Sequence, residues 1–75
     1  MPVVRKQSFD STSIASAMYA APRLTLDIEF RGGGTYRYFE VPPSIYAGLL
    51  DAASKGQFLH RSIRGRYVYE RVLSG

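Results

Sequence analysis

Residues 24–41 contain two strand-like stretches separated by three consecutive glycines, and this arrangement constrains the fold more than any other feature of the sequence. In the first stretch, large apolar side chains alternate with polar ones, which is the pattern of a strand with one dry and one wet face. The second stretch, residues 35–41, is rich in aromatic and β-branched side chains. The glycines at 32–34 can adopt the positive φ angles that tight turns require. The segment predicts a β-hairpin, and the dry face of its first strand would carry Leu24, Leu26, Ile28 and Phe30.

The length of the turn decides which side chains of the second strand face the core. A two-residue turn would place Arg37 on the dry face, whereas an odd-length turn would place Tyr36 and Tyr38 there. In the second case Arg37 points outward beside Asp27 or Glu29. Burying an unpaired guanidinium costs several kcal/mol, far more than a cross-strand charge pair contributes. The odd-length turn is therefore favoured, and the two tyrosines are expected mainly in the core.

Two helices are expected after the hairpin. Pro42 and Pro43 end the strand and suit a first helical turn, and an amphipathic pattern of apolar residues follows them. A second helix is expected to begin at a capping box, in which Ser54 and Gln57 bond each other, and to stop at Gly65.

The fold class predicted is α+β, with a small antiparallel β-meander of about three strands packed by two C-terminal helices. Residues 14–19 alternate weakly and are read as a first strand, although a helix is also compatible with them. Residues 66–73 form either a short C-terminal edge strand or an extended tail. Residues 1–9 are expected to be a flexible N-terminal segment, and residues 10–75 a single domain, as the total of 75 residues suggests.

Composition excludes several classes of function. The chain has no cysteine, so disulfides and thiolate chemistry are excluded, and its single histidine makes a histidine-based metal site implausible. No apolar run approaches the ~20 residues that cross a bilayer, and the N-terminus lacks the apolar core of a signal peptide. We therefore expect a cytoplasmic protein with no cofactor, no metal and no membrane contact.

The positive charge is concentrated in the last third of the chain. Residues 1–54 contain as many acids as bases, whereas residues 55–75 carry the whole net charge of +4. Such a block is typical of proteins that bind a polyanion, although a solvated surface has the same composition. The favoured function is therefore binding of RNA, either tRNA or a single strand, through the exposed face of the second helix. The candidate binding residues are Arg37, Lys55, His60, Arg61, Arg64, Arg66 and Tyr67.

Two other functions are compatible with the sequence. A protein-interaction or homodimerisation module is the alternative, because tyrosines, arginines and an edge strand suit docking. A small nuclease would use His60 as general acid or base, with Lys55, Arg61 or Arg64 stabilising the transition state. Because no second histidine or paired carboxylate accompanies His60, we expect no enzyme and name no catalytic residue.

Several short motifs, taken in order, resemble the KTSC domain, the lysine-tRNA-synthetase C-terminal domain. The segments that carry the resemblance are Ser11-Thr12-Ser13-Ile14, Leu26-x-Ile28-x-Phe30, Tyr36-Arg37-Tyr38, Ala53-Ser54-Lys55-Gly56 and Ile63-Arg64-Gly65-Arg66-Tyr67. The resemblance implies a domain that occurs alone or appended to some bacterial lysyl-tRNA synthetases, with RNA binding suggested by that company. It also places the family's Tyr-x-Tyr motif at Tyr36 and Tyr38, where it serves either the core or base stacking.

Overall fold

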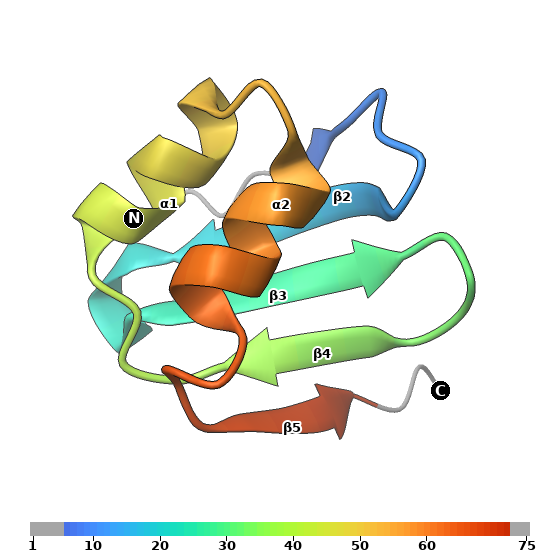
Figure 1. Ribbon diagram of the computed structural model, residues 1–75. Coiled ribbons are helices and arrows are strands. Elements are labelled where there is room, and N and C mark those ends of the chain that lie inside the picture. The colour runs from blue at the N-terminus through green and yellow to red at the C-terminus, as the bar shows by residue number, and fades with distance from the viewer. Residues whose placement is uncertain (1–5, 73–75) are drawn as a thin grey trace.

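The computed structural model describes residues 6–72, which form one antiparallel sheet with a helical layer on one face (Figure 1). The strands lie in the order β1-β2-β3-β4-β5. One three-residue helical turn connects β2 to β3, and the other helical segments connect β4 to β5. The strands are β1 (Lys6–Ser8), β2 (Ile14–Ala20), β3 (Thr25–Phe30), β4 (Thr35–Tyr38) and β5 (Tyr69–Val72). The helical segments are η1 (Ala21–Arg23), α1 (Pro43–Asp51), α2 (Lys55–Phe58) and η2 (Leu59–Ile63). The predicted α+β class is confirmed.

The sheet has five strands, so the prediction of about three was too low. β1 lies inside the segment 1–9 that the sequence predicted to be flexible, and it pairs with β2 from Lys6 opposite Met18 to Ser8 opposite Ser16. Its residues show no apolar alternation in the sequence. Backbone pairing with β2 holds this strand in the sheet. Residues 1–5 of that segment lie outside the described residues. The C-terminal edge strand is present as β5, which pairs with β4.

The hairpin of β3 and β4 has the odd-length turn that the cost of burying Arg37 predicted. The Phe30 N–H donates to the carbonyl of Gly34 at 3.0 Å, which encloses three turn residues. Tyr36 therefore lies opposite Ile28, and Arg37 lies opposite Asp27. The register prediction is confirmed, with both tyrosines of the motif on the helix side of the sheet.

Leu24 does not belong to the dry face, contrary to the sequence prediction. It follows the short turn η1 in the left-handed conformation, with φ of 55°, and its side chain is 39% exposed. The strand β3 begins only at Thr25. The period-two pattern correctly placed Leu26 and Ile28, which are fully buried, but it could not detect the turn before them.

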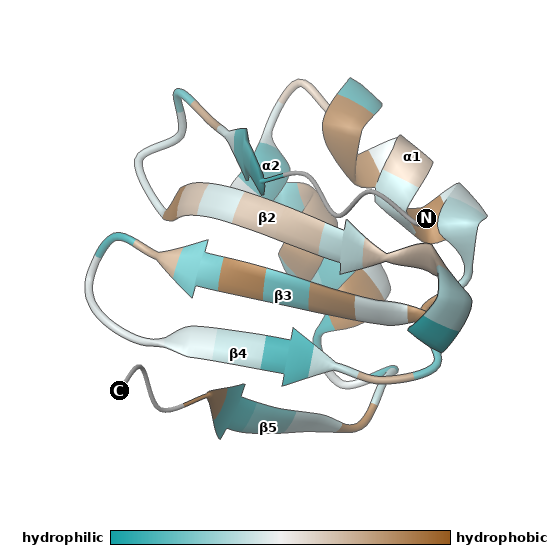
Figure 2. Cartoon of the chain, turned by 180° about the vertical axis from the view of Figure 1, so that it is seen from behind, coloured by the Kyte–Doolittle hydropathy of each residue, from teal (hydrophilic) through white to brown (hydrophobic). Residues whose placement is uncertain are grey.

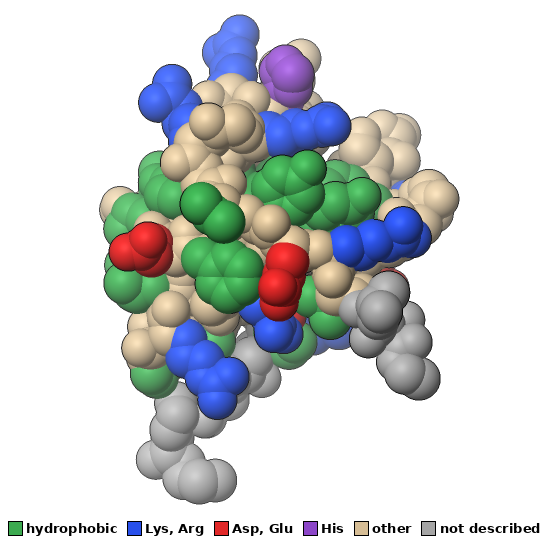
Figure 3. Space-filling model, turned by 90° about the horizontal axis from the view of Figure 1, so that it is seen from below, with side chains coloured by type: hydrophobic (Ala, Val, Ile, Leu, Met, Phe, Trp, Pro, Cys, Tyr) green, Lys and Arg blue, Asp and Glu red, His purple; other side chains and the backbone are tan. Residues whose placement is uncertain are grey.

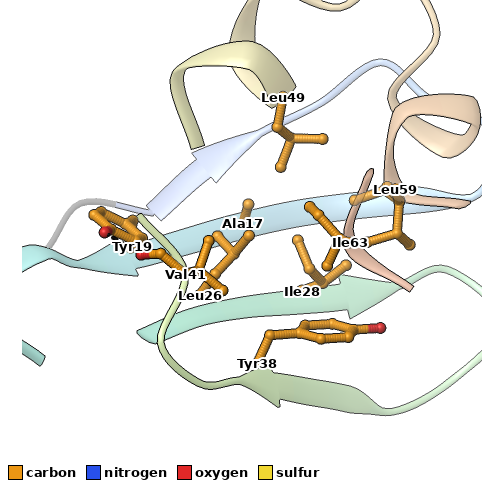
Figure 4. Packing of buried hydrophobic residues seen from close by; sticks show 10 residues of the cluster. Ala17, Tyr19, Leu26, Ile28, Tyr38, Val41, Leu49, Leu59 and Ile63 are labelled. Atoms are coloured by element: carbon orange, nitrogen blue, oxygen red, sulfur yellow. Dashed lines mark hydrogen bonds between the residues drawn. The ribbon is translucent and has the colours of Figure 1, made fainter. Parts of the chain in front are cut away.

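The core fills the space between the sheet and the helical layer (Figure 4). Buried side chains from β2, β3, β4, the β4–α1 connection, α1 and η2 meet there. Tyr19 donates its hydroxyl to the carbonyl of Val41 at 2.5 Å, so its buried polar atom has a partner. The buried apolar residues are Ile14, Ala17, Tyr19, Leu26, Ile28, Tyr38, Val41, Leu49, Leu59 and Ile63.

The second helix differs from the regular helix that the sequence predicted. The Ser54 hydroxyl accepts from the Gln57 N–H at 3.3 Å, as expected for a helix cap. After one α-helical turn the chain widens into the π-helical segment η2, where the Arg64 N–H donates to the Leu59 carbonyl at 2.8 Å. Gly65, with φ of 79°, ends the helix as predicted. Within residues 6–72, no helix is both long and apolar enough to cross a membrane.

Buried tyrosines should make the fold sensitive to alkali. Burial raises the pKa of Tyr19, Tyr38 and Tyr46 above the ordinary value. The folded state then favours the neutral phenol, so its stabilising effect is complete below about pH 10 and is lost as the pH rises through the folded-state pKa. We expect the free energy of unfolding, measured by urea titration, to be lower at about pH 11 than at about pH 8. A Tyr19→Phe variant should show a shallower fall, and equal stability at both pH values would contradict the expectation.

Candidate functional site

The exposed side of η2 faces a groove that the N-terminal loop closes from the other side. The groove has a volume of about 610 Å³, and we call it the serine–arginine groove. Its walls come from residues 11–13, from the start of α2 and from η2, so segments more than 40 positions apart in the sequence meet there. Its lining residues are Ser11, Thr12, Ser13, Phe30, Ser54, Gly56, Gln57, Leu59, His60, Arg61 and Arg64.

Backbone contacts hold the hydroxyl-rich wall of the groove in place. The Ser11 hydroxyl accepts from the backbone N–H groups of Ser13 and Ile14, each at 3.2 Å. Arg31 donates to the carbonyls of Ser11 at 2.5 Å and Phe9 at 2.7 Å, which ties this loop to the end of β3. The loop is thus fixed from both sides, and its serines belong to a defined surface.

Gly56 lets the loop approach α2 closely. A Cβ atom at this position would lie 3.1 Å from the Ser13 hydroxyl oxygen, which is tighter than an ordinary contact. The glycine that the sequence placed in the helix cap therefore also determines how narrow the groove is.

The π-helical segment sets which side chains enter the groove. Leu59 and Ile63 are buried and anchor η2 on the sheet. His60, Arg61 and Arg64 are exposed, and all three line the groove. The sequence therefore correctly expected these three side chains on the exposed face, even though it predicted a regular helix.

Within residues 6–72, neither groove arginine forms an ion pair with an acidic side chain. The ion pairs among residues 6–72 join Lys6 to Glu29 and Arg37 to Asp27. Among the residues that the structure describes, no aspartate or glutamate lines the groove. Arg61 and Arg64 are therefore exposed cations in a groove that serines also line, an arrangement that suits an anion.

Two of the predicted binding residues lie elsewhere. Arg37 points from the sheet face that the helices leave uncovered (Figure 2), and it bonds both carboxylate oxygens of Asp27 at 2.9 and 3.0 Å. This bidentate pair raises the pKa of Arg37. Lys55 donates to the carbonyls of Leu50 at 2.8 Å and Ala52 at 2.6 Å, so it caps the end of α1.

The remaining predicted residues do not line the groove. Arg66 is exposed and donates to the Arg61 carbonyl at 3.0 Å, which holds the turn after η2. Tyr67 is half-buried and packs against the core, as does Tyr36. Tyr38 is only 2% exposed, and burial raises its pKa although the nearby charge of Arg64 opposes this. Of the predicted set, the structure thus brings His60, Arg61 and Arg64 together.

Sequence reasoning missed the serine wall of the groove. The hydroxyl-rich run at residues 11–13 is visible in the sequence, but short hydroxyl side chains are typical of turns and caps. Ser11 does cap the backbone of the loop. The contact with α2 arises from the fold, and no local pattern in the sequence could reveal it.

The comparisons with known proteins agree on one family. A family model described as the KTSC domain matches residues 10–67. A crystal structure of a KTSC domain protein from Yersinia pestis superimposes with a TM-score of 0.91 and 31% identity, covering 95% of this chain and all of that one. A protein from Tsukamurella paurometabola is 38% identical over 61 residues, which are 81% of this chain and 91% of that protein.

Longer relatives match over a small part of their length. A lysine–tRNA ligase from Nostoc punctiforme is 38% identical over 63 residues, and one from Trichormus variabilis is 36% identical over 63 residues. In each case the match covers 84% of this chain but only 11% of the ligase. The chain therefore corresponds to about a tenth of these enzymes.

Proposed function

The chain belongs to the KTSC domain family, and from this premise we propose that its serine–arginine groove binds RNA through the phosphate backbone. The observation that carries the proposal is the pair of unneutralised arginines, Arg61 and Arg64, in a groove without acidic residues. They lie in the part of the chain that holds the whole net charge of +4. A phosphate-bearing polymer is the partner that this chemistry recognises.

The groove offers a phosphate two kinds of donor. A guanidinium donates two parallel N–H groups to phosphate oxygens, which gives short, charge-assisted bonds. The hydroxyls of Ser13 and Ser54 lie in the same groove and can add neutral hydrogen bonds. His60, on the same surface, can donate from its ring. Arg37 and Lys55 are left out of this interface because their donors are already used within the fold.

The matched ligases give a second, weaker support. Their name states that they act on tRNA. This chain resembles a region that makes up only about a tenth of their length. Association with a tRNA-using enzyme is a reason to test tRNA alongside a short single strand, but it does not identify the ligand.

A protein-interaction or homodimerisation module is the alternative function. It is favoured by the edge of the sheet, where Val68 is 75% and Tyr69 is 53% exposed. Exposed apolar side chains beside an open strand edge are typical of docking surfaces. A nuclease is not proposed, since the lining of the groove brings neither a carboxylate nor a second histidine to His60.

Salt dependence distinguishes the two functions. The dissociation constant for a single-stranded RNA of about 12 nucleotides, and for tRNA, would be measured by fluorescence anisotropy between about 50 and 300 mM KCl. Contacts from two arginines predict a slope of log K on log salt between about −1 and −2 for the single strand, at roughly −0.7 per phosphate. Absence of binding, or an affinity indifferent to salt, would contradict the proposal.

A further inference from the structure

Three aromatic side chains lead from the serine–arginine groove to the exposed edge of the sheet. Phe30 lines the groove, and its ring centre lies 5.5 Å from that of Tyr36 in an edge-to-face arrangement. The Tyr36 ring centre lies in turn 5.4 Å from that of Tyr69 on β5. The groove is therefore joined to the sheet edge by a continuous row of rings.

The pairing of β4 with β5 shows that this row lies on the helix side of the sheet. Tyr69 is opposite Tyr38, and Arg71 is opposite Tyr36. Opposite residues of an antiparallel pair point to the same face. The guanidinium of Arg71 lies beside the turn, with its Nε 3.2 Å from where a Cβ of Gly34 would be. Figure 3 views the molecule from below, on the side of β5, and shows the histidine and several Lys and Arg side chains above a hydrophobic band.

Exposure increases from the inner tyrosines, Tyr36 and Tyr38, to Tyr69. Tyr38 is 2% exposed and Tyr36 is half-buried, so neither offers a free ring face, whereas Tyr69 is 53% exposed. The Tyr69 ring rests on both inner tyrosines, with ring centres 5.4 and 5.5 Å apart. It is thus an exposed ring backed by the core, and two successive ring contacts connect it to the serine–arginine groove.

We propose, on the basis of the RNA-binding function above, that Tyr69 stacks on a nucleic-acid base and that the ligand is consequently single-stranded. A base stacks on an aromatic side chain only when one of its faces is free, and duplex pairing leaves the faces covered by neighbouring bases. Phosphates held by Arg61 and Arg64 would bring the adjacent nucleotides to this ring. Because every base has a π-face, the contact is tolerant of sequence.

The test uses a single-stranded RNA that carries 2-aminopurine, a fluorescent base whose emission falls on stacking, and a duplex of the same sequence. Tyr69→Ala should weaken binding of the single strand by about 5- to 150-fold and abolish the fluorescence change. Tyr69→Phe, which keeps the ring, should retain both. Val68→Ala is the matched control, because Val68 is the exposed neighbour that makes none of these ring contacts. The duplex should bind the native chain more weakly than the single strand does.

Tyr69→Leu decides the matter if the alanine variant is unstable, because leucine keeps apolar packing on the inner tyrosines but has no π-face. Native affinity and quenching in Tyr69→Leu, while Arg61→Gln weakens binding, would overturn the stacking role and leave the proposed function standing. Absence of RNA binding by the native chain would overturn both. A Tyr69→Ala variant whose sedimentation changes but whose RNA affinity does not would assign this edge to a protein partner instead.

Discussion

Tyr38→Ala should lower the free energy of unfolding by about 3–5 kcal/mol, the cost of removing a large buried aromatic side chain. Tyr38 is 2% exposed, lies opposite Leu26 in the sheet and forms part of the core cluster. A domain of this length is stable by only about 4–11 kcal/mol. The variant is therefore expected to be largely unfolded or marginally stable, as urea denaturation followed by circular dichroism would show.

The control for this prediction is Tyr38→Phe. It keeps the ring and its contact with Tyr69, whose centre lies 5.5 Å away, so its stability should stay close to that of the native chain. A contrary result would be a Tyr38→Ala variant that unfolds at the same urea concentration as the native chain but no longer binds RNA. It would show that Tyr38 is a surface stacking residue and that the register described above is incorrect.

Replacing both groove arginines should strongly weaken the binding of nucleic acid. The Arg61→Gln, Arg64→Gln double variant removes two phosphate contacts and their charge-assisted hydrogen bonds, so we expect the affinity for single-stranded RNA to fall by at least about tenfold. The slope of affinity on salt should become shallower at the same time. Both side chains are exposed, so the melting temperature should change little.

A control with the same change in net charge separates local contacts from overall electrostatics. The Lys6→Gln, Arg23→Gln variant also removes two positive charges, from exposed residues outside the groove. It should reduce affinity only slightly, since long-range attraction is screened over about 8–10 Å in physiological salt. Equal losses in the two double variants would mean that net charge, and not the groove, is responsible.

The sequence predicted those features that depend on local pattern and charge. The alternation around Ile28 located the central strand, and the cost of burying Arg37 fixed the register of the hairpin. The α+β class followed from the predicted hairpin and helices, and the family resemblance followed from motifs in order along the chain; both are confirmed. In each case neighbouring residues, or a single pairing, contained the information.

Features that depend on the assembled fold were missed. β1 has polar side chains and forms by pairing with the edge of β2, so no local sequence pattern predicted it. Lys55 was assigned to the binding surface, but its ammonium caps α1 and lies 5.4 Å from the centre of the Phe9 ring. The groove itself forms only where loop 11–13 meets α2. The sequence did not identify Tyr69 as a candidate binding residue, because the exposure of its side chain depends on how β5 pairs with β4.

The most direct test of the central claim is an NMR titration of the native chain with single-stranded RNA at low and moderate salt. Binding through the groove predicts amide shift changes in loop 11–13 and in residues 57–66, with Arg side-chain signals affected and all changes reduced by salt. The uncovered face of the sheet, including Asp27 and Arg37, should be unaffected. Shift changes centred on that face, or no changes at all, would contradict the proposal that the serine–arginine groove holds the phosphate backbone.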